Sequence, residues 1–461
     1  GEFDYIKNIE IVEGTTGNET ITGNAEDNKL TGNAGDDSID GGAGIDSITF
    51  FNAAGAIVLN LNGVTNGDGY LVVDMGGGET DYVKNVENIE GTNFGDEIYG
   101  NADDNIISGG SGDDKMVFSV GNDTIYGDGG EDWMFFSNNA VLTDTITESS
   151  WGITFDMSIN EGGSEDTVVT LVGHPSGDTT VMNGIEHVDG TVLADNMTGD
   201  SRDNTFLGDA GADVINGGAG ADYIAGEAGT DTIDAGSGDD TIIVGDGDAV
   251  DSIDGGIGTD HVNASSRTDD IDVNLTAGTM GGVEGASGEI TGVENVTTGA
   301  GDDTVIGNAD DNIIITNDGA DVLYGGAGDD TLDGGNDRDE VDYTAHATDV
   351  SVDLTGANAL VNDGAGDADT LQNIEDITAS THDDSFRVDV NQLAGMAGNN
   401  AYDGGAGSDV VRAVGSDSFE LSDFEGVFTN VEEINISGVD IDTLSANGHD
   451  LTFDLSATDI V

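Results

Sequence analysis

The sequence contains no cysteine, a single proline, and only nine lysine and arginine residues against 94 aspartate and glutamate residues. Without cysteine the chain forms no disulfide and lacks the thiolates that structural zinc sites use. Its formal net charge of −85 over 461 residues excludes nucleic acid and anionic membrane surfaces as partners, because like charges repel. No apolar run approaches the roughly 20 residues of a membrane-spanning helix, so we expect no membrane insertion. The composition indicates cations as partners.

Glycine is abundant instead, with 75 residues, and hydrophobic residues make up 36% of the chain. Both follow a nine-residue unit with glycine at positions one and four, aspartate at position six and an apolar residue at position eight, as in "GNAGDDSID" followed by "GGAGIDSIT". A single match would be weak, but ten units carry all four residues. They begin at Gly32, Gly41, Gly109, Gly127, Gly208, Gly217, Gly226, Gly255, Gly325 and Gly404.

The units gather into five tracts within a larger repeat. Each tract follows an apolar and glutamate signature such as "KNVENIEGT" at Lys84, and precedes a segment of alternating apolar residues such as "AIVLNLN" at Ala56. Alternation with period two predicts strands. We therefore expect five modules, namely 1–89, 90–189, 190–297 with the longest tract, 298–378, and 379–461, which is degenerate and ends in a C-terminal β region.

One nonapeptide fits a short strand followed by a tight turn, so that two units make one coil. The apolar eighth residue, such as Ile39, Ile48, Met116, Ile215 or Leu332, is predicted to point inward and to stack on its counterpart one coil away. The glycines allow the positive φ and the close backbone approach that such a turn requires. Helical periodicity is almost absent, so we predict an all-β chain.

The aspartates at position six converge when coils stack. Unneutralised carboxylates a few ångströms apart repel each other by roughly 1 to 4 kcal/mol per pair. A hard divalent cation removes that repulsion, and carboxylates with turn carbonyls supply the six to eight oxygen atoms that Ca²⁺ prefers. Mg²⁺ requires a stricter octahedron, and Zn²⁺ lacks its cysteine and clustered histidine ligands. Several bound Ca²⁺ ions are therefore expected.

These units resemble the RTX, or hemolysin-type, nonapeptide "GGxGxDxUx". The linking segments, for example "ADTLQNIEDITAS", resemble those of large type I-secreted surface-layer and adhesin proteins. The resemblance implies a parallel β-roll, or β-solenoid, of calcium-binding nonapeptide tracts that alternate with strand-rich linking segments. It also implies secretion to the extracellular surface of a Gram-negative-type bacterium, with folding triggered there by Ca²⁺.

The candidate metal ligands are the aspartates at position six, with the firmest sites expected around Asp213, Asp222, Asp231 and Asp240. The second unit of the first four tracts has a neutral asparagine there instead (Asn28, Asn105, Asn204 and Asn312), which predicts a weaker or absent site. The full candidate set is Asp37, Asp46, Asp96, Asp114, Asp123, Asp132, Asp195, Asp213, Asp222, Asp231, Asp240, Asp251, Asp260, Asp303, Asp321, Asp330, Asp339, Asp384 and Asp409.

Two further groups of residues have both a structural and a functional interpretation. The recurrent Glu10, Glu87, Glu186, Glu294 and Glu375 could complete sites at the ends of each tract, but outward strand positions are favoured. Trp133, Trp151 and the phenylalanines are expected in the core.

No catalytic pattern is present. The six histidines do not form HExxH, no serine stands in GxSxG, and no P-loop lysine follows a glycine. We therefore expect that the chain is not an enzyme.

Three classes of function remain. The first, which the five-module layout favours, is an extracellular structural protein: a surface-layer, matrix or adhesin rod that becomes rigid in Ca²⁺ and joins other copies in a lattice or filament. The second is a ligand-binding module of an adhesin, with a surface glycan or lipopolysaccharide bound through other regions. The third is the repeat region of a secreted enzyme whose catalytic domain lies outside this chain.

Overall fold

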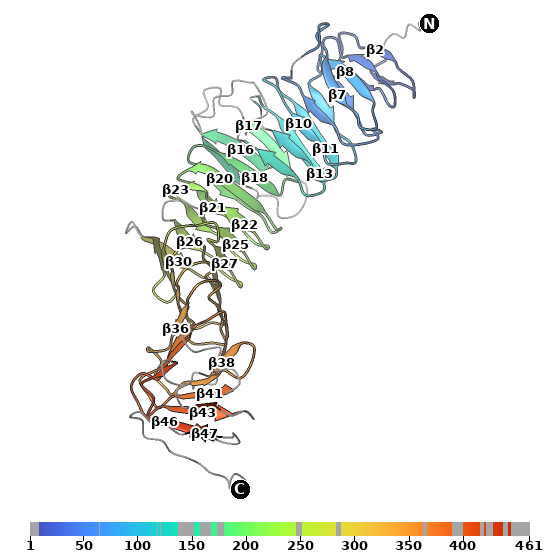
Figure 1. The fold of residues 1–461 in the computed structure, drawn as a ribbon. Helices are drawn as coiled ribbons and strands as arrows, with labels where there is room; N and C mark the ends of the chain where they lie inside the picture. The colour runs from blue at the N-terminus through green and yellow to red at the C-terminus, as the bar shows by residue number, and fades with distance from the viewer. Residues whose placement is uncertain are drawn as a thin grey trace. The chain divides into compact units, whose positions relative to one another are not determined.

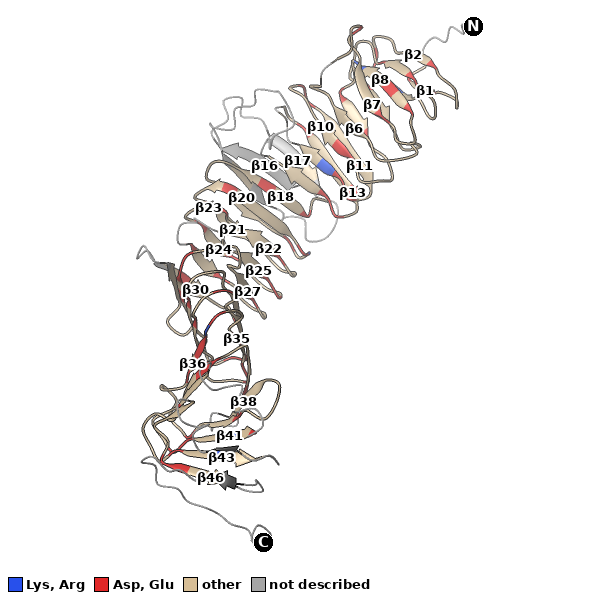
Figure 2. Cartoon of the chain, viewed as in Figure 1, with Lys and Arg blue, Asp and Glu red and all other residues tan. Residues whose placement is uncertain are grey.

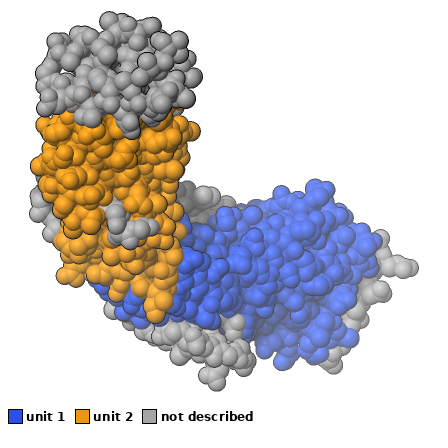
Figure 3. Space-filling view, turned by 90° about the horizontal axis from the view of Figure 1, so that it is seen from below, with its two compact units in different colours: residues 1–240 blue, residues 241–461 orange. Residues whose placement is uncertain are grey.

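The computed structural model describes residues 9–63, 65–117, 119, 121–136, 152–156, 167–172, 179–245, 251–282, 287–362, 367–389, 400–414, 419–420, 427–436 and 441–443. Within these ranges every regular element is a β-strand, and no helix could cross a membrane. The chain divides into two compact units, Gly1–Asp240 and Thr241–Val461 (Figure 3). Each unit is described separately below.

In unit 1 the strands form two sheets (Figure 1). The first sheet contains β1 (Ile11–Glu13), β3 (Lys29–Thr31), β5 (Ser47–Thr49), β9 (Asn88–Glu90), β11 (Ile106–Ser111), β13 (Thr124–Gly129), β15 (Gly152–Asp156), β16 (Thr167–Val172), β17 (Thr179–Asn183), β19 (Asn196–Thr198), β21 (Val214–Asn216) and β24 (Thr232–Asp234). The second contains β2 (Thr20–Thr22), β4 (Ser38–Asp40), β6 (Val58–Asn60), β7 (Leu71–Asp74), β8 (Thr80–Lys84), β10 (Glu97–Tyr99), β12 (Lys115–Val117), β14 (Trp133–Phe135), β18 (His187–Thr191), β20 (Thr205–Gly211), β22 (Tyr223–Ala225) and β23 (Ala228–Gly229).

Unit 2 repeats this arrangement. Its first sheet contains β26 (Ser252–Asp254), β28 (Ile271–Asn274), β29 (Thr279–Gly282), β30 (Ser287–Thr291), β32 (Thr304–Ile306), β34 (Val322–Tyr324), β36 (Glu340–Asp342), β40 (Asp376–Thr378), β42 (Ala401–Asp403) and β45 (Phe428–Thr429). The second contains β25 (Thr241–Ile243), β27 (His261–Asn263), β31 (Asn295–Thr297), β33 (Ile313–Ile315), β35 (Thr331–Asp333), β37 (Ser351–Asp353), β38 (Ala359–Asn362), β39 (Ala368–Gln372), β41 (Ser385–Asp389), β43 (Val410–Val414) and β46 (Glu433–Ile436). A separate pair joins β44 (Phe419–Glu420) and β47 (Ile441–Thr443).

Successive nonapeptides alternate between the two sheets, so two units make one coil. Within an uninterrupted tract, a strand therefore pairs in parallel with the strand 18 residues further along: Ile215 of β21 stands opposite Ile233 of β24, and Ile314 of β33 opposite Leu332 of β35. The predicted all-β, parallel β-roll fold is confirmed by this pairing.

The core is the space between the two sheets. A three-residue strand points its first and third side chains outward and its middle one inward. Ile39, Ile48, Met116, Ile215 and Leu332 occupy that middle place and are at most 1% exposed. The prediction that the eighth residue of each nonapeptide points inward is confirmed.

Between the tracts, the chain forms antiparallel meanders of three strands. In the first one, β7 pairs antiparallel with β6 and β8, while β8 continues in parallel from β4 and β6 leads in parallel into β10. The strands β15 to β17, β28 to β30 and β37 to β39 form the same arrangement. Because the outer strands of each meander take the places of nonapeptide strands, the parallel pairing passes through the linking segments.

Two separate structural requirements explain why glycine occurs in the turns. At position two the backbone is left-handed, with φ of 99° at Gly218 and 110° at Gly326, and asparagine or aspartate replaces glycine there, as at Asn317 with φ of 66°. At position four, Gly220 has a φ of 121°, and a β-carbon on this residue would also collide with the Arg202 carbonyl of the preceding coil. Turns this tight bring backbone carbonyls of neighbouring coils close together.

Candidate metal centres

All nineteen candidate aspartates are buried, with at most 7% of the side chain of any one exposed. Position six ends the turn and lies two residues before the inward apolar residue, so its side chain points to the same side of the strand. Figure 2 shows the wider pattern, in which acidic residues are spread along both units and lysine and arginine are few. Burial of so many carboxylates requires compensation, since an uncompensated buried charge is costly.

One carboxylate oxygen of these aspartates accepts a backbone hydrogen bond from the neighbouring coil. Asp213 Oδ1 accepts the backbone N–H of Asp195, one coil earlier, at 2.7 Å, and Asp222 Oδ1 accepts that of Asn204 at 2.7 Å. In unit 2, Asp339 Oδ1 accepts the N–H of Asp321 at 3.0 Å. Repeated from coil to coil, these bonds line the carboxylates up in rows, which we call the aspartate ladders.

The other oxygen differs between members of the set. Among the described residues, several candidates have a buried Oδ2 atom with no hydrogen-bond partner, including Asp37, Asp46, Asp114, Asp132, Asp213, Asp222, Asp339 and Asp409. Buried polar atoms in proteins are nearly always bonded, so each such oxygen indicates a missing ligand. A cation coordinated there would satisfy it.

In four other candidates, both oxygens are already bonded within the chain. Thr191 donates its N–H to Asp195 Oδ2 at 2.7 Å, while Ile153 donates its N–H to Oδ1. Asp96 is held in the same way by Thr92 and Ile57. Ser380 and Ser119 donate to Asp384 and Asp123, which also accept backbone N–H groups. The sequence pattern predicts the same role in metal binding for these aspartates as for the others. The structure shows that they differ, because neither of their oxygens is free.

Carbonyl oxygens complete the surroundings of the free carboxylate oxygens. A methyl group added to Gly208, at position one, would lie 2.6 Å from the carbonyl oxygen of Gly226 and 2.7 Å from Asp213 Oδ2. At Gly217 the corresponding atoms are the Ala235 carbonyl oxygen and, at 2.5 Å, Asp222 Oδ2. These are oxygen donors of the kind that suit a hard cation such as Ca²⁺. The residues present therefore fit calcium.

The acidity of the ladder aspartates is strongly altered. Burial raises the pKa of Asp114, Asp213, Asp222 and Asp339 to about 7, and that of Asp132 to about 6. The backbone N–H that each carboxylate accepts lowers its pKa, and neighbouring carboxylates raise it further. A bound divalent cation would reverse this shift, because it favours the charged form.

Two ladders end on aspartates of the linking segments, which were not among the predicted metal ligands. Asp37 donates its N–H to Asp81 Oδ1 at 2.9 Å, and Asp330 donates its N–H to Asp369 Oδ1 at 3.1 Å. Asp81 and Asp369 lie on meander strands and are at most 2% exposed. Both keep the spacing of an aspartate two residues before an inward apolar residue, and that spacing is the signal that could have revealed them.

The recurrent glutamates close the remaining ladder ends. The Oε2 atoms of Glu87, Glu186, Glu294 and Glu375 accept the backbone N–H of Asp46, Asp132, Asp260 and Asp339, at 2.8 to 3.2 Å. Glu432 does the same for Asp409. The favoured outward position is wrong for these four glutamates, because the ladder needs an acceptor where the tract ends. Glu10 is exposed.

The asparagines at position six use their oxygen locally. Asn105 Oδ1 accepts the N–H of Asn101 within its own turn at 2.9 Å, and Asn312 Oδ1 accepts that of Asn308 at 2.9 Å. Their Nδ2 atoms donate to the carbonyls of Glu87 and Glu294. An amide oxygen engaged in this way is a poor cation ligand.

The expectation that the aromatic residues lie in the core is confirmed for Phe206, which is fully buried, and is wrong for Phe51, which is 54% exposed. Trp133 lies on the outward side of β14 and is half-buried, so its predicted core position is wrong; Trp151 lies outside the described residues. In the described part of the chain, no three histidine, cysteine, aspartate or glutamate residues gather into a metal cluster. Each coil contributes carboxylates to the ladders. Backbone carbonyl oxygens near them, such as that of Gly226, are further possible cation ligands.

Taken together, coils of 18 residues, parallel short strands and rows of buried carboxylates define a β-roll built to hold hard cations. The family model for the RTX calcium-binding nonapeptide repeat matches residues 13–48, 86–118, 119–139, 189–224, 198–233, 217–250, 291–321, 306–341 and 391–411. The chain is an RTX-repeat protein, and Ca²⁺ is the cofactor of its repeats.

No curated protein sequence matches the chain. Among solved structures, the chain is similar to a hyperactive, Ca²⁺-dependent, β-helical antifreeze protein from an Antarctic bacterium, with 15% sequence identity and a TM-score of 0.17 over 95% of this chain and 96% of that one.

Proposed function

We propose that this chain is an extracellular structural protein of a surface layer, matrix or adhesin, which folds and becomes rigid when it binds Ca²⁺ outside the cell. The observation that carries the proposal is the free Oδ2 atom of the buried ladder aspartates, as in Asp213 and Asp222. Such carboxylates disfavour the coiled state until a cation joins them. Millimolar Ca²⁺, as found outside cells, would therefore decide whether the chain folds.

The ligands in this proposal are the position-six aspartates with a free oxygen. Carbonyl oxygens of the adjoining turns would complete the coordination; the Gly226 carbonyl oxygen, which approaches Gly208 together with Asp213 Oδ2, is one of them. Bound Ca²⁺ supplies the positive charge that neutralises the ladders. The chain's own residues supply the coil geometry that holds one Asp oxygen in place and leaves the other available.

The experiment is a Ca²⁺ titration of the purified chain after treatment with chelator. Circular dichroism is expected to change from coil to β-sheet in millimolar Ca²⁺ and to revert on adding chelator. A chain with full strand content in excess chelator would contradict the proposal.

Self-assembly is the second part of the proposal and has its own test. Electron microscopy of the chain in Ca²⁺ is expected to show lattices or filaments, and sedimentation should show species larger than one chain. A protein that stays monomeric at high concentration in Ca²⁺ rules out this part and leaves Ca²⁺-dependent folding intact. The absence of catalysis is likewise proposed, from the repeat-only architecture.

A second candidate function, binding of a neutral glycan, is favoured by a row of rings on the second sheet of unit 1. Trp133 and Phe135 project outward from β14, with ring centroids 5.6 Å apart and planes 17° apart. The ring of His187, opposite Trp133 in β18, has its centroid 4.7 Å from that of Trp133 and is tilted by 33°. Aromatic rings that project outward from a sheet offer apolar surface on which pyranose rings stack, and the acidic surroundings exclude anionic glycans.

Isothermal titration with neutral oligosaccharides in Ca²⁺ tests this candidate. Trp133→Ala should abolish binding, whereas Tyr126→Ala on the first sheet should not. Equal binding by both variants would remove this row as the recognition surface.

A further inference from the structure

Arg202 stands where a nonapeptide normally has glycine. It is position four of "GDSRDNTFL", the second unit of the third tract, and the equivalent units of the second and fourth tracts have Asp103 and Asp310 there. A cationic side chain at this point is unusual in a chain with nine basic residues. Its surroundings explain what it does.

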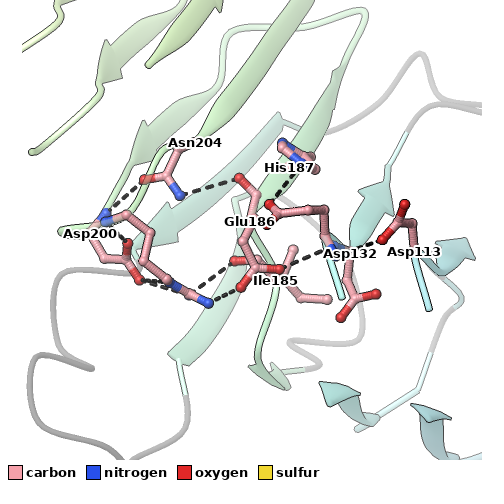
Figure 4. Close-up of polar contacts among 9 residues, drawn as sticks. Asp113, Asp132, Ile185, Glu186, His187, Asp200 and Asn204 are labelled. Carbon is pink, nitrogen blue, oxygen red and sulfur yellow. Dashed lines mark hydrogen bonds and ion pairs between the residues drawn. The ribbon is translucent and has the colours of Figure 1, made fainter. Parts of the chain in front are cut away.

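The guanidinium group of Arg202 binds oxygen atoms of Ile185, Glu186 and Asp200, the residues labelled in Figure 4, while the arginine side chain stays 44% exposed. Its Nη1 forms an ion pair with Glu186 Oε1, its Nη2 and Nε donate to Asp200 Oδ2 at 2.7 and 2.9 Å, and its Nη2 also donates to the Ile185 carbonyl at 3.4 Å. The side chains of Glu186 and Asp200 are each only 8% exposed. Two carboxylates and a carbonyl thus converge on one positive group.

The acids that hold Arg202 are themselves parts of the coil. Glu186 Oε2 closes the preceding ladder by accepting the N–H of Asp132 at 3.1 Å, and Asp200 Oδ1 accepts the N–H of Arg202 at 2.8 Å. Asn204 fixes the same turn, because its Oδ1 accepts the Asp200 N–H and its Nδ2 donates to the Glu186 carbonyl. The guanidinium therefore joins the end of one tract to the start of the next.

The junctions at Glu87 and Glu294 have the same framework without a base. Asn105 and Asn312 bond the carbonyls of Glu87 and Glu294 at 2.8 Å, as Asn204 bonds that of Glu186 at 3.3 Å. At the first of these junctions, burial raises the pKa of Glu87, and the charges of Asp46 and Asp103 raise it further. The Glu186 junction differs by carrying its own positive charge.

We propose that Arg202 is a built-in cation that takes the place of a divalent ion between Glu186, Asp200 and the Ile185 carbonyl, so that this junction stays ordered without Ca²⁺. The three oxygens that bind the guanidinium are donors that Ca²⁺ also accepts. Burial lowers the pKa of Arg202 while Glu131 and Asp132 raise it, and arginine stays protonated at neutral pH. A permanent, covalently attached charge thus replaces a diffusible one at this junction.

The inference rests on the proposed Ca²⁺-dependent folding, and the test separates the two. Native mass spectrometry counts the Ca²⁺ ions bound to the wild-type chain, to Arg202→Gly and to a control, Arg387→Gly, whose exposed partner is Asp353. Arg202→Gly should bind one more Ca²⁺ per chain than the wild type and the control. An equal count in all three overturns the inference, whereas a wild type that binds no Ca²⁺ overturns both ideas.

Hydrogen exchange gives a second, independent measurement with Arg202→Gln, which removes the charge and keeps most of the side chain. Amides of β18 and β20 should lose protection in chelator, at least about tenfold relative to the wild type, and recover it in Ca²⁺. If the substitution lowers protection equally with and without Ca²⁺, the guanidinium does not stand in for the ion. If protection is unchanged in chelator, the charge has no role at this junction.

Discussion

A ladder aspartate with a free Oδ2 atom uses one oxygen for a bond within the coil and leaves the other available to a cation. The Oδ1 atom of Asp213 accepts the Asp195 N–H, whereas its Oδ2 atom has no partner. In Asp195, four residues after Thr191, both oxygens are bonded within the chain. Two neighbouring members of one row thus differ in their capacity to bind a cation, although the nonapeptide pattern gives them the same place.

Replacing Asp213 with asparagine tests this division. The amide oxygen can still accept the Asp195 N–H, but the charge at Oδ2 is lost, so we expect the Ca²⁺ affinity of that site to fall at least about tenfold. The midpoint of Ca²⁺-induced folding, followed by circular dichroism, should rise. Asp195→Asn is the matched control and should shift the midpoint less; a larger shift in the control would reverse the assignment.

Position-one glycines are required by space, since a methyl group on Gly208 would meet the Gly226 carbonyl oxygen and Asp213 Oδ2. We expect Gly208→Ala to lower the free energy of unfolding in Ca²⁺ by about 1 to 3 kcal/mol, through overpacking. Gly129, whose nearest atom would lie 3.8 Å from an added methyl group, is the control and should tolerate alanine. Thermal unfolding of the two variants provides the comparison, and similar losses would contradict the crowding argument.

At the scale of the strand, sequence spacing predicted much of the fold. The nine-residue period fixes both the inward apolar residue and the aspartate two places before it, as in Asp213 and Ile215. It could not predict where ladders end, because Asp81 and Asp369 receive bonds from residues 44 and 39 positions earlier, across a meander. The sequence also could not predict that Asp96 and Asp195 lack a free Oδ2 atom, since this depends on the backbone N–H of the threonine four residues earlier turning toward the carboxylate.

The rows of buried carboxylates also make the stability of the metal-free coil depend on pH. The pKa of Asp213, Asp222 and Asp339 is about 7 in the coil, against an ordinary value of about 3.9. The metal-free coil therefore binds more protons than the unfolded chain, and its stability falls as pH rises from about 4 through about 7.

The prediction is that, in chelator, strand content measured by circular dichroism is greater at pH 5 than at pH 8. In saturating Ca²⁺ the order should be reversed or absent, because protons compete with the ion for the same carboxylates. Equal strand content at the two pH values in chelator would show that the ladder aspartates do not govern folding.

For the whole molecule, net charge and metal binding act together. A formal charge of −85 favours expansion of the metal-free chain. Monovalent salt screens this repulsion at distances beyond about 10 Å, but it does not fill the ladder positions. The division into five modules remains a prediction at this scale.

Small-angle scattering can separate screening from site binding. Adding about 0.15 M NaCl in chelator should reduce the radius of gyration modestly without producing strands, whereas millimolar Ca²⁺ should produce both compaction and strands. Mg²⁺ at equal concentration should resemble NaCl, because it keeps its water and requires a strict octahedron. Full folding in Mg²⁺ would contradict the assignment to Ca²⁺.

The parallel pairing of each coil with the next one also determines how the protein would respond to mechanical load. A coil is held to its neighbour by two short strands, as β21 is held to β24 by three residue pairs. A pull on the chain ends loads only the outermost coil, so coils should detach one after another, each releasing about 60 Å of chain. Bound ions resist each step, and the concentration of Ca²⁺ would thus set the force at which such a tether lengthens.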